Sequence, residues 1–239
     1  MPADETLASA VILAGGLGTR LAPITDTTPK PLVRVKGRPF IEHQLELLKR
    51  RGITDVLILT GYLGDQIEST LGSGEVLGLR LTYSREVSPV GTAGALVNAI
   101  QLLPEEFFLV YGDSYLDLDY QELAVTFRSR RGPDPAGLMV VSNALGPEDM
   151  GNVKLDRTGT RVVSYSKGAG GEYTYLDAGV LIFTRSIVMF IPRGVHAMLE
   201  DCVYPRMAQE GRLLASSTRA KFYDIGTSER LDVFERSLS

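Results

Sequence analysis

Short apolar runs alternate with amphipathic stretches over the first half of the chain. The runs that we interpret as strands are residues 9–14, 54–60, 79–84 and 106–111. Residues 40–52 place Ile41, Leu45 and Leu48 at helical spacing, and further helices are expected at 90–103 and 119–130. Strands that alternate with helices are typical of parallel sheets with helical crossovers, so the pattern predicts an α/β fold.

The pattern becomes β-dominated after a turn-rich stretch at residues 131–137. Strands are expected at 136–143, 152–156, 161–166 and 173–183, and helices at 198–210 and 227–238. The turn-rich stretch is too short for a flexible linker. We therefore expect one domain over residues 1–239, whose second half is built onto the same sheet.

Composition and charge narrow the classes of partner. The 239 residues are 44% hydrophobic and carry 25 basic and 29 acidic side chains, with a net charge of −4 and no block of like charge. Nucleic acid and membrane surfaces are therefore disfavoured as partners. Cys202 is the single cysteine, the two histidines lack zinc-ligand spacing, and the acidic N-terminus does not resemble a signal peptide. These features favour a cytoplasmic protein and leave its oligomeric state open, a homo-oligomer included.

The stretch LAGGLGTRLAPITDTTPKPLV at residues 13–33 directly follows the first expected strand. Glycines this dense usually let backbone approach a ligand closely, although a tight turn could need them for geometry alone. The stretch lacks the GxxxxGK of a P-loop, and position 21 is leucine where the dinucleotide fingerprint has its third glycine. With Arg20 and Lys30 inside it, the segment predicts a long loop that wraps a triphosphate through backbone amides and two cations.

The longer stretch LAGGLGTRLAPITDTTPKPLVRVKGRPFIEH resembles the amino-terminal signature of the sugar-1-phosphate nucleotidyltransferases, AGGxGTRLxPxTxxxPKPLxxVxGKP. Further matches follow in the family's order at residues 90–94, 111–113, 176–179 and 222–227. The resemblance implies a Rossmann-like three-layer α/β/α fold of the nucleotide-diphospho-sugar transferase type, with a mostly parallel mixed central sheet. It also implies a nucleotide-binding half at 1–130 and a sugar-phosphate-binding half at 131–239. The hexapeptide pattern of the C-terminal left-handed β-helix found in larger members is absent from this sequence.

The resemblance implies a Mg²⁺-assisted, in-line attack by a sugar 1-phosphate on the α-phosphate of a nucleoside triphosphate, with release of pyrophosphate. The catalytic residues would be Arg20, Lys30 and Asp113, and the metal ligands Asp113 and Asp224. The implied nucleotide-binding residues are Leu13, Ala14, Gly15, Gly16, Gly18, Thr19, Arg20, Glu86, Gly91 and Thr92. The implied residues for the sugar phosphate are Lys30, Gly151, Lys167, Asp177 and Gly179.

Glu86 makes GTP the favoured nucleotide, because a carboxylate can accept hydrogen bonds from the N1–H and N2–H₂ groups of guanine. The alternative interpretation of Glu86 is that it is a solvent-facing residue at the end of a strand, without a role in binding. The surrounding pattern resembles the mannose-1-phosphate and heptose-1-phosphate guanylyltransferase branches. Ser166-Lys167-Gly168 departs from the family's Glu-Lys-Pro, which leaves the sugar open, and the run at 167–173 is expected to order on binding.

Two alternatives remain at the level of sequence. One is a uridylyl-, thymidylyl- or cytidylyltransferase of the same fold, with a sugar 1-phosphate or a phosphocholine-like acceptor. The other is a non-catalytic regulatory protein that binds sugar nucleotides. The two carboxylates Asp113 and Asp224 argue against the second, because a pure binder does not need a metal site.

Overall fold

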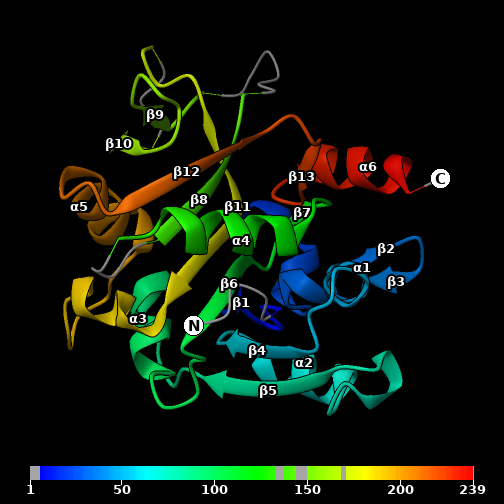
Figure 1. Cartoon of the computed structure of the whole chain (residues 1–239). Helices are drawn as coiled ribbons and strands as arrows, with labels where there is room; N and C mark the ends of the chain where they lie inside the picture. The colour runs from blue at the N-terminus through cyan, green and yellow to red at the C-terminus, as the bar shows by residue number, and fades with distance from the viewer. Residues whose placement is uncertain (1–5, 133–136, 144–149, 168–170, 239) are drawn as a thin grey trace.

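A seven-stranded sheet forms the centre of the computed structural model, which describes residues 6–132, 137–143, 150–167 and 171–238. Its strands, in spatial order, are β12 (Leu213–Thr218), β8 (Gly137–Ser142), β11 (Leu176–Thr184), β6 (Glu106–Tyr111), β1 (Ser9–Ala14), β4 (Asp55–Thr60) and β5 (Arg80–Arg85) (Figure 1). Strand β11 runs antiparallel to both of its neighbours, whereas the other neighbouring pairs are parallel. The predicted mixed, mostly parallel sheet is therefore confirmed.

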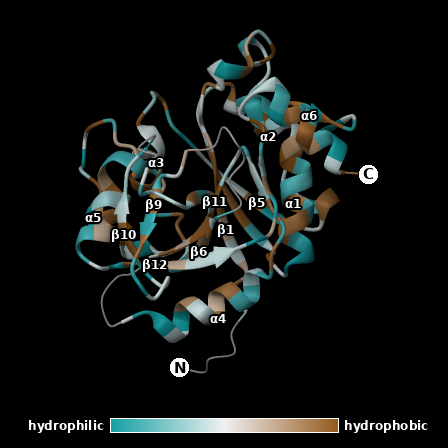
Figure 2. Cartoon of the chain, turned by 90° about the horizontal axis from the view of Figure 1, so that it is seen from above, coloured by the Kyte–Doolittle hydropathy of each residue, from teal (hydrophilic) through white to brown (hydrophobic). Residues whose placement is uncertain are grey.

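Helices cover both faces of this sheet. One face packs against α1 (Phe40–Arg50), α2 (Gly64–Leu71) and α4 (Tyr120–Arg130). The other packs against α3 (Gly91–Asn98), the 3₁₀ helix η5 (Arg185–Phe190) and α5 (Tyr204–Gln209). Successive residues of a strand point to opposite faces, so Ile12 enters the first core and Val11 the second. Viewed from above, apolar strands lie between the more polar outer helices (Figure 2), which confirms the three-layer arrangement.

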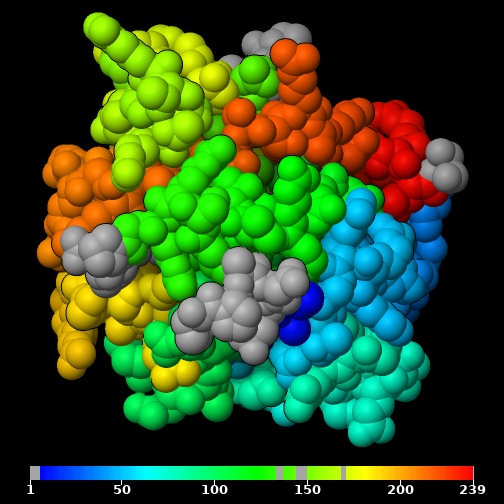
Figure 3. Space-filling model, in the orientation of Figure 1, coloured from blue at the N-terminus to red at the C-terminus, as the bar shows by residue number. Residues whose placement is uncertain are grey.

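The C-terminal helix packs against an early part of the chain. Helix α6 (Ser228–Ser237) places Phe234 in a small core with Val35, Phe40 and Ile225. In the space-filling view, residues from the C-terminal end lie beside N-terminal residues on one side of the molecule (Figure 3). This contact positions the strand that carries Asp224.

Several short elements complete the fold. The two-residue strands β2 (Arg34–Val35) and β3 (Arg38–Pro39) pair with each other, as do β7 (Ser114–Leu116) with β13 (Phe222–Asp224) and β9 (Val153–Leu155) with β10 (Val162–Tyr165). The remaining helical segments are η1 (Thr19–Leu21), η2 (Ile24–Asp26), η3 (Lys30–Leu32), η4 (Glu75–Leu77) and the π-helix η6 (Leu199–Val203). Across the described ranges, no helix is long and apolar enough to cross a membrane.

The structure adds elements that the hydrophobic pattern did not predict, among them α2, β7, β12 and β13. Helix α2 begins at a glycine after the left-handed residue Leu63 and has no side-chain N-cap, so it lacks the usual start signals. The helix expected at 90–103 ends at Asn98, and the one expected at 198–210 begins with the π-turn η6. Parts of the segments expected at 131–137, 136–143 and 167–173, namely 133–136 and 168–170, lie outside the described residues.

Candidate active site

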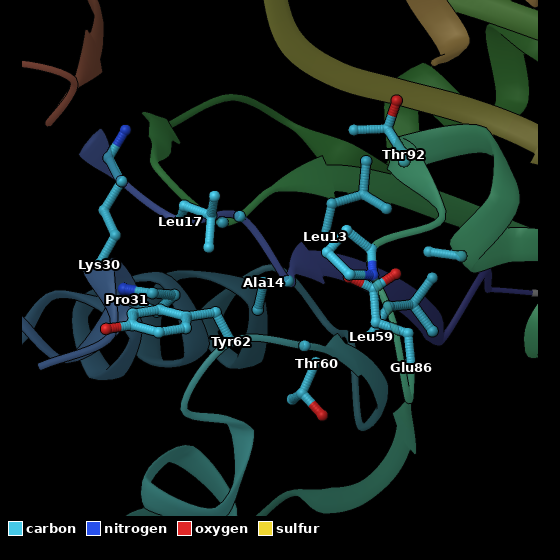
Figure 4. A pocket seen from close by; sticks show the side chains of 18 of the residues that line it. Leu13, Ala14, Leu17, Lys30, Pro31, Leu59, Thr60, Tyr62, Glu86 and Thr92 are labelled. Atoms are coloured by element: carbon cyan, nitrogen blue, oxygen red, sulfur yellow. The ribbon is translucent and has the colours of Figure 1, made fainter. Parts of the chain in front are cut away.

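A cleft of about 1080 Å³ opens at the carboxyl ends of β1, β4 and β6. Open α/β sheets bind their ligands at this edge, where the strands end and the loops diverge. The cleft is lined by the glycine-rich loop after β1, the loops after β4 and β5, the start of α3, the turn after β6 and a distant segment at 196–200. Lys30 and Thr92 lie toward opposite sides of it, with Ala14 between them (Figure 4).

The glycine-rich loop is held by contacts within itself and with the loop between β4 and α2. The Thr25 hydroxyl donates to the Gly18 carbonyl at 3.0 Å, and the Tyr62 hydroxyl donates to the Asp26 carbonyl at 2.8 Å. A Cβ built on Gly16 would meet no atom within 4 Å, so this glycine is not required by packing. Its backbone is open to the cleft, as a phosphate cradle requires.

Arg20 extends from this loop and is exposed. A Cβ on Gly226 would lie 3.2 Å from the Arg20 guanidinium, so the loop meets the segment after β13 at this point. No carboxylate of the described residues forms an ion pair with Arg20. Its planar donors are therefore available to a phosphate group.

Lys30 and Asp113 both line the cleft and form an ion pair, with Nζ and Oδ2 2.5 Å apart. The buried amide of Gln44 on α1 holds the turn that carries Asp113, donating to the carbonyls of Tyr111 at 2.9 Å and Ser114 at 2.5 Å. The Lys30 side chain is 13% exposed and that of Asp113 is 31% exposed, so both can be reached from the cleft. A cation and a carboxylate held in this way can bind an anionic phosphate and a metal ion respectively.

Asp224 lies close to Asp113 through strand pairing. Strand β13 pairs with β7 so that Asp224 is opposite Ser114, and the Ile225 N–H donates to the Asp113 carbonyl at 3.0 Å. The Asp224 carboxylate accepts a hydrogen bond from the Gly226 N–H at 2.8 Å and forms an ion pair with Arg230, and it does not line the cleft itself. Among the described residues no group of three or more His, Cys, Asp or Glu could hold a metal ion. Asp113, in the turn before β7, and Asp224, at the end of β13, are therefore the two carboxylates that the β7–β13 pairing brings to this edge of the sheet.

Glu86 lies on the opposite wall of the cleft from Lys30 (Figure 4). Its Oε2 accepts a hydrogen bond from the Val90 N–H at 3.3 Å, and its Oε1 would be 3.2 Å from a Cβ on Gly15. Burial raises the pKa of this carboxyl, while the Val90 N–H and the nearby His196 lower it. The carboxylate is held in place against backbone, which suits recognition of a planar N–H edge.

Gly91 has a packing role that the sequence did not reveal. Its φ is +80°, and an added Cβ would lie 2.4 Å from the Ala197 carbonyl oxygen. That carbonyl accepts hydrogen bonds from the Ala93 and Gly94 N–H groups at 2.9 and 3.2 Å. Gly91 is therefore required by the contact between the start of α3 and the 196–200 segment, whatever the ligand.

Of the residues predicted for the sugar phosphate, Lys30 lines the cleft, whereas Gly151, Asp177 and Gly179 gather around the start of β11. Gly151, Asp177 and Gly179 do not line the cleft, and Lys167 is exposed and outside its lining. The Asp177 N–H donates to Asn152 Oδ1 at 2.9 Å, which ties β11 to the β9–β10 hairpin. Asp177 Oδ1 accepts from the Gly179 N–H at 2.9 Å, while its buried Oδ2 has no hydrogen-bond partner among the described residues.

Burial raises the pKa of Asp177 to about 7, the Gly179 N–H lowers it, and the negative charge of Glu200 raises it further. Burial also raises the pKa of Tyr111 and Tyr204, whose hydroxyls are hydrogen-bonded to each other at 2.9 Å. This part of the molecule therefore combines two carboxyl groups with a set of buried, neutral phenols.

Sequence reasoning missed the contribution of His196, Met198 and Glu200 to the cleft. No motif marks these residues, because their position depends on how η6 packs against α3, about a hundred residues earlier in the chain. Tyr62 was also missed, although it lines the cleft and anchors the glycine-rich loop.

The fold and the cleft together define a class of open α/β proteins with a ligand site at the carboxyl ends of the parallel strands. Comparison with known proteins gives the particular family: residues 9–236 match the description "Nucleotidyl transferase", and the chain belongs to this family.

Mannose-1-phosphate guanyltransferase beta-B of Xenopus laevis is 33% identical over 222 residues, which are 91% of this chain and 61% of that protein. Mannose-1-phosphate guanylyltransferase of Mycobacterium tuberculosis is 31% identical over 92% of this chain and 61% of its own length. The chain thus spans about three fifths of the curated relatives it matches. The crystal structure of HddC from Yersinia pseudotuberculosis superposes with a TM-score of 0.83 at 26% identity, covering 98% of this chain and 100% of HddC. HddC has also been solved in complex with GMP-PN, with a TM-score of 0.80 to this chain.

Proposed function

We propose that this protein transfers a guanylyl group from GTP to a sugar 1-phosphate and releases pyrophosphate. The observation that carries the proposal is the Lys30–Asp113 pair in a cleft that is also lined by a glycine-rich loop, whose Arg20 forms no ion pair with the described residues. Relatives that are named mannose-1-phosphate guanylyltransferases, and the GMP-PN complex of HddC, support the choice of reaction and of nucleotide.

The phosphate chemistry follows from the placement of the charges. Both substrates are anions, so the reaction needs positive charge where they meet and where pyrophosphate departs. In our proposal Arg20 and the amides of Gly15, Gly16 and Gly18 hold the triphosphate. Lys30 contacts the α-phosphate and the incoming sugar phosphate, which reduces their mutual repulsion and stabilises the charge that develops on the transferred group.

The chemistry of this family implies a divalent cation, and we propose Mg²⁺. Asp113 and Asp224 would hold it, because Asp113 directly precedes β7, which pairs with the strand of Asp224, and Mg²⁺ combines few carboxylates with phosphate oxygens. When bound, the ion would supply Lewis-acid stabilisation to the phosphates. Lys30 and Arg230, the present partners of the two carboxylates, limit the repulsion between them when the ion is absent.

The preference for GTP is assigned to Glu86. A fixed carboxylate accepts two N–H donors from the guanine edge, whereas uracil and thymine would present a carbonyl to the same position. The Val90 N–H and the backbone of Gly15 limit the movement of this side chain. A site that is built for a particular N–H pattern discriminates strongly against bases that lack it.

The test is a matrix of GTP, UTP, dTTP and CTP against mannose 1-phosphate and glucose 1-phosphate, in Mg²⁺, with pyrophosphate release as the readout. We expect turnover with GTP and a kcat/KM for GTP at least about tenfold above that for the other nucleotides. Glu86→Gln should lower kcat/KM for GTP about ten- to a hundredfold, whereas the exposed Glu75→Gln serves as the matched control and should not. Pyrophosphate release with none of the pairs would refute the proposal, and a clear preference for another nucleotide would refute its GTP part.

A further inference from the structure

Glu200 brings a second carboxylate into the cleft from the second half of the chain. It belongs to the π-helix η6 and lines the cleft together with Thr92 and Tyr111. None of the roles assigned above to the glycine-rich loop, the metal or the base uses it. The question is what ligand chemistry this carboxylate would serve.

Thr92 fixes the orientation of Glu200. The Thr92 hydroxyl accepts a hydrogen bond from the Leu199 N–H at 2.8 Å and lies 3.0 Å from Glu200 Oε2. A hydroxyl has a single proton, and the Leu199 N–H can only donate. The Thr92 proton therefore goes to the Glu200 carboxylate at 3.0 Å in preference to the weaker acceptor Met198 Sδ at 4.0 Å. The backbone on either side is also held, because the Ala197 N–H donates to the Val90 carbonyl at 2.9 Å and the Ala197 carbonyl accepts from α3.

The other oxygen of Glu200, Oε1, receives no hydrogen bond from the part of the chain that the structure describes. Its surroundings contain a second acceptor that lacks a donor, since Asp177 Oδ2 is buried without a partner. Glu200 is close enough to Asp177 for its charge to act on that carboxyl. The free Glu200 oxygen belongs to a residue that lines the open cleft, so it suits a hydroxyl donor on a ligand, whereas Asp177 Oδ2 is buried and Asp177 does not line the cleft.

The side of the cleft on which Glu200 lies indicates which hydroxyls these are. Asp177 is tied to Asn152 and so to the β9–β10 hairpin, in the half of the chain that follows the nucleotide-binding strands. Glu86, to which we assign recognition of the nucleobase, is held instead by the Val90 N–H in the loop after β5. Glu200 therefore lies between the base wall and the β11 edge, on the side of Asp177.

We infer that Glu200 binds a hydroxyl group of the sugar in the sugar 1-phosphate and takes part in the selection of that substrate. The inference rests on the proposed function for the identity of the ligand. The choice of Glu200 as the binding residue rests on geometry. Its carboxylate lies in the cleft, Thr92 fixes its orientation, and its second oxygen receives no hydrogen bond from the described residues.

The experiment measures binding of mannose 1-phosphate, and of glucose 1-phosphate as a second probe, to the full chain by calorimetry in Mg²⁺ with α,β-methylene-GTP present. Glu200→Gln keeps the Thr92 hydrogen bond through the amide oxygen and turns an N–H₂ donor toward the substrate. We expect sugar-phosphate affinity to fall about ten- to a hundredfold, and the affinity for the nucleotide analogue to stay within about twofold. Glu200→Asp keeps the negative charge, but its side chain is shorter by one methylene, so the carboxylate no longer reaches as far toward the substrate. It should also weaken sugar-phosphate binding.

Asp201→Asn is the matched control, because Asp201 is exposed on the same π-turn and does not line the cleft. It should leave both affinities unchanged, and circular dichroism should show that every variant is folded. Loss of nucleotide affinity with sugar-phosphate affinity intact would place Glu200 at the ribose and overturn the inference. So would a wild-type protein that binds neither probe.

The two proposals fail separately. If wild type binds a sugar phosphate in a manner that depends on Glu200 but releases no pyrophosphate from GTP, the inference holds and the proposed function is wrong. If wild type turns over GTP and Glu200→Gln binds the sugar phosphate as tightly as wild type does, the function holds and the inference is wrong.

Discussion

Lys30 and Asp113 are 83 residues apart in the chain and form the ion pair on which the proposed chemistry depends. The sequence motifs predicted Lys30 as a phosphate contact and Asp113 as a metal ligand but gave no hint that the two residues contact each other. The contact arises because η3 and the turn after β6 both end at the same edge of the sheet. A pair that is partly exposed contributes little to stability by itself, so its value lies in the chemistry that it makes possible.

Lys30→Gln should lower kcat about a hundred- to a thousandfold, because it removes a cation at the point where charge develops in the transition state. The melting temperature should change little, since the remaining Asp113 is 31% exposed and can be solvated. Lys49→Gln is the control, because the Lys49 ammonium is exposed and donates only to the Leu77 carbonyl in the described structure. Retention of wild-type kcat by Lys30→Gln would remove Lys30 from the catalytic residues.

The pH dependence of stability should report on Asp177, whose pKa is about 7 against an ordinary value of 3.8. Between these two values the folded protein binds a proton that the unfolded chain releases, so stability is lost as pH rises through this window. Asp177→Asn cannot ionise and keeps an oxygen for the Gly179 N–H. Its stability relative to wild type should therefore increase from pH 5 to pH 8, by about 2 to 4 kcal/mol at about 1.36 kcal/mol per pKa unit.

Urea unfolding at the two pH values measures this difference. The titratable groups around Asp177 are Glu200 and three tyrosines, Tyr111, Tyr165 and Tyr204, whose pKa values burial raises, so the phenols stay neutral throughout. Asp156→Asn provides the control: hydrogen bonds, first of all from Thr158, lower the pKa of Asp156, so its effect should be the same at both values. A pH-independent Asp177→Asn difference would mean that Asp177 is already ionised at pH 5.

At the scale of elements, the glycine-rich loop contains glycines of two kinds. Gly18 has φ +65° and packs against Thr25 and Lys30, so its conformation needs glycine even without a ligand. Gly16 has neither a positive φ nor a neighbour within 4 Å of an added Cβ. Only Gly16 can therefore test whether a ligand comes close to the loop.

Gly16→Ala should raise KM for GTP about tenfold or more, because the added methyl group would occupy space that the triphosphate needs. The free energy of unfolding should stay within about 0.5 kcal/mol of wild type, as for an exposed substitution without strain. Gly132→Ala is the matched control, since Gly132 is also exposed with nothing within 4 Å of an added Cβ. An unchanged KM would show that the triphosphate does not approach Gly16.

The elements that could be predicted from sequence are those with a continuous apolar run. Strands β1 and β6 lie at 9–14 and 106–111 as expected, because each is buried on both faces and reads as one block of hydrophobic residues. Strand β12 was missed because the second half of LLASST is polar, and its backbone pairing with β8 at the sheet edge compensates for this. Three-residue strands such as β13 depend wholly on a partner and leave no pattern of their own.

At the scale of the whole molecule, the C-terminal helix α6 packs against the start of α1, almost two hundred residues earlier in the chain. Phe234 of α6 is fully buried and its ring lies 5.2 Å from that of Phe40, which begins α1. Tyr115 and Tyr223, from β7 and β13, contact the same ring. Packing of α6 therefore supports the strand pair that carries Asp224.

Phe234→Ala should lower the free energy of unfolding by about 3 to 5 kcal/mol, because it leaves a cavity among aromatic rings. Turnover should fall more than the loss of folded protein explains, since the β7–β13 pair loses its support. Urea unfolding and pyrophosphate release measure the two effects. Val233→Ala, at a side chain that is 40% exposed on the same helix, should cost less than about 1 kcal/mol. Equal effects of the two substitutions would contradict this account of α6.

The candidate site could be predicted from sequence only where one continuous motif carries it. Residues Leu13–Arg20 line one cleft together with Lys30, Glu86 and Asp113, all of which belong to the predicted motifs. Glu200 could not be found in this way, because its role depends on Thr92, which is 108 residues away in the chain. Motifs record local backbone geometry, whereas contacts between the halves depend on packing that no single stretch encodes.

The start of α3 has a consequence for any attempt to redesign substrate choice. Val90 holds Glu86 through its N–H, and two residues later Thr92 holds Glu200 through its hydroxyl. On the assignments proposed above, one turn of backbone thus sets the geometry of both selection sites. A loop graft that exchanges residues 86–92 for those of a relative with another base preference would carry over that relative's placement of Glu200 as well. Specificity for the base and specificity for the sugar are then coupled. A variant that changes only one of them would need compensating changes in the 196–200 segment.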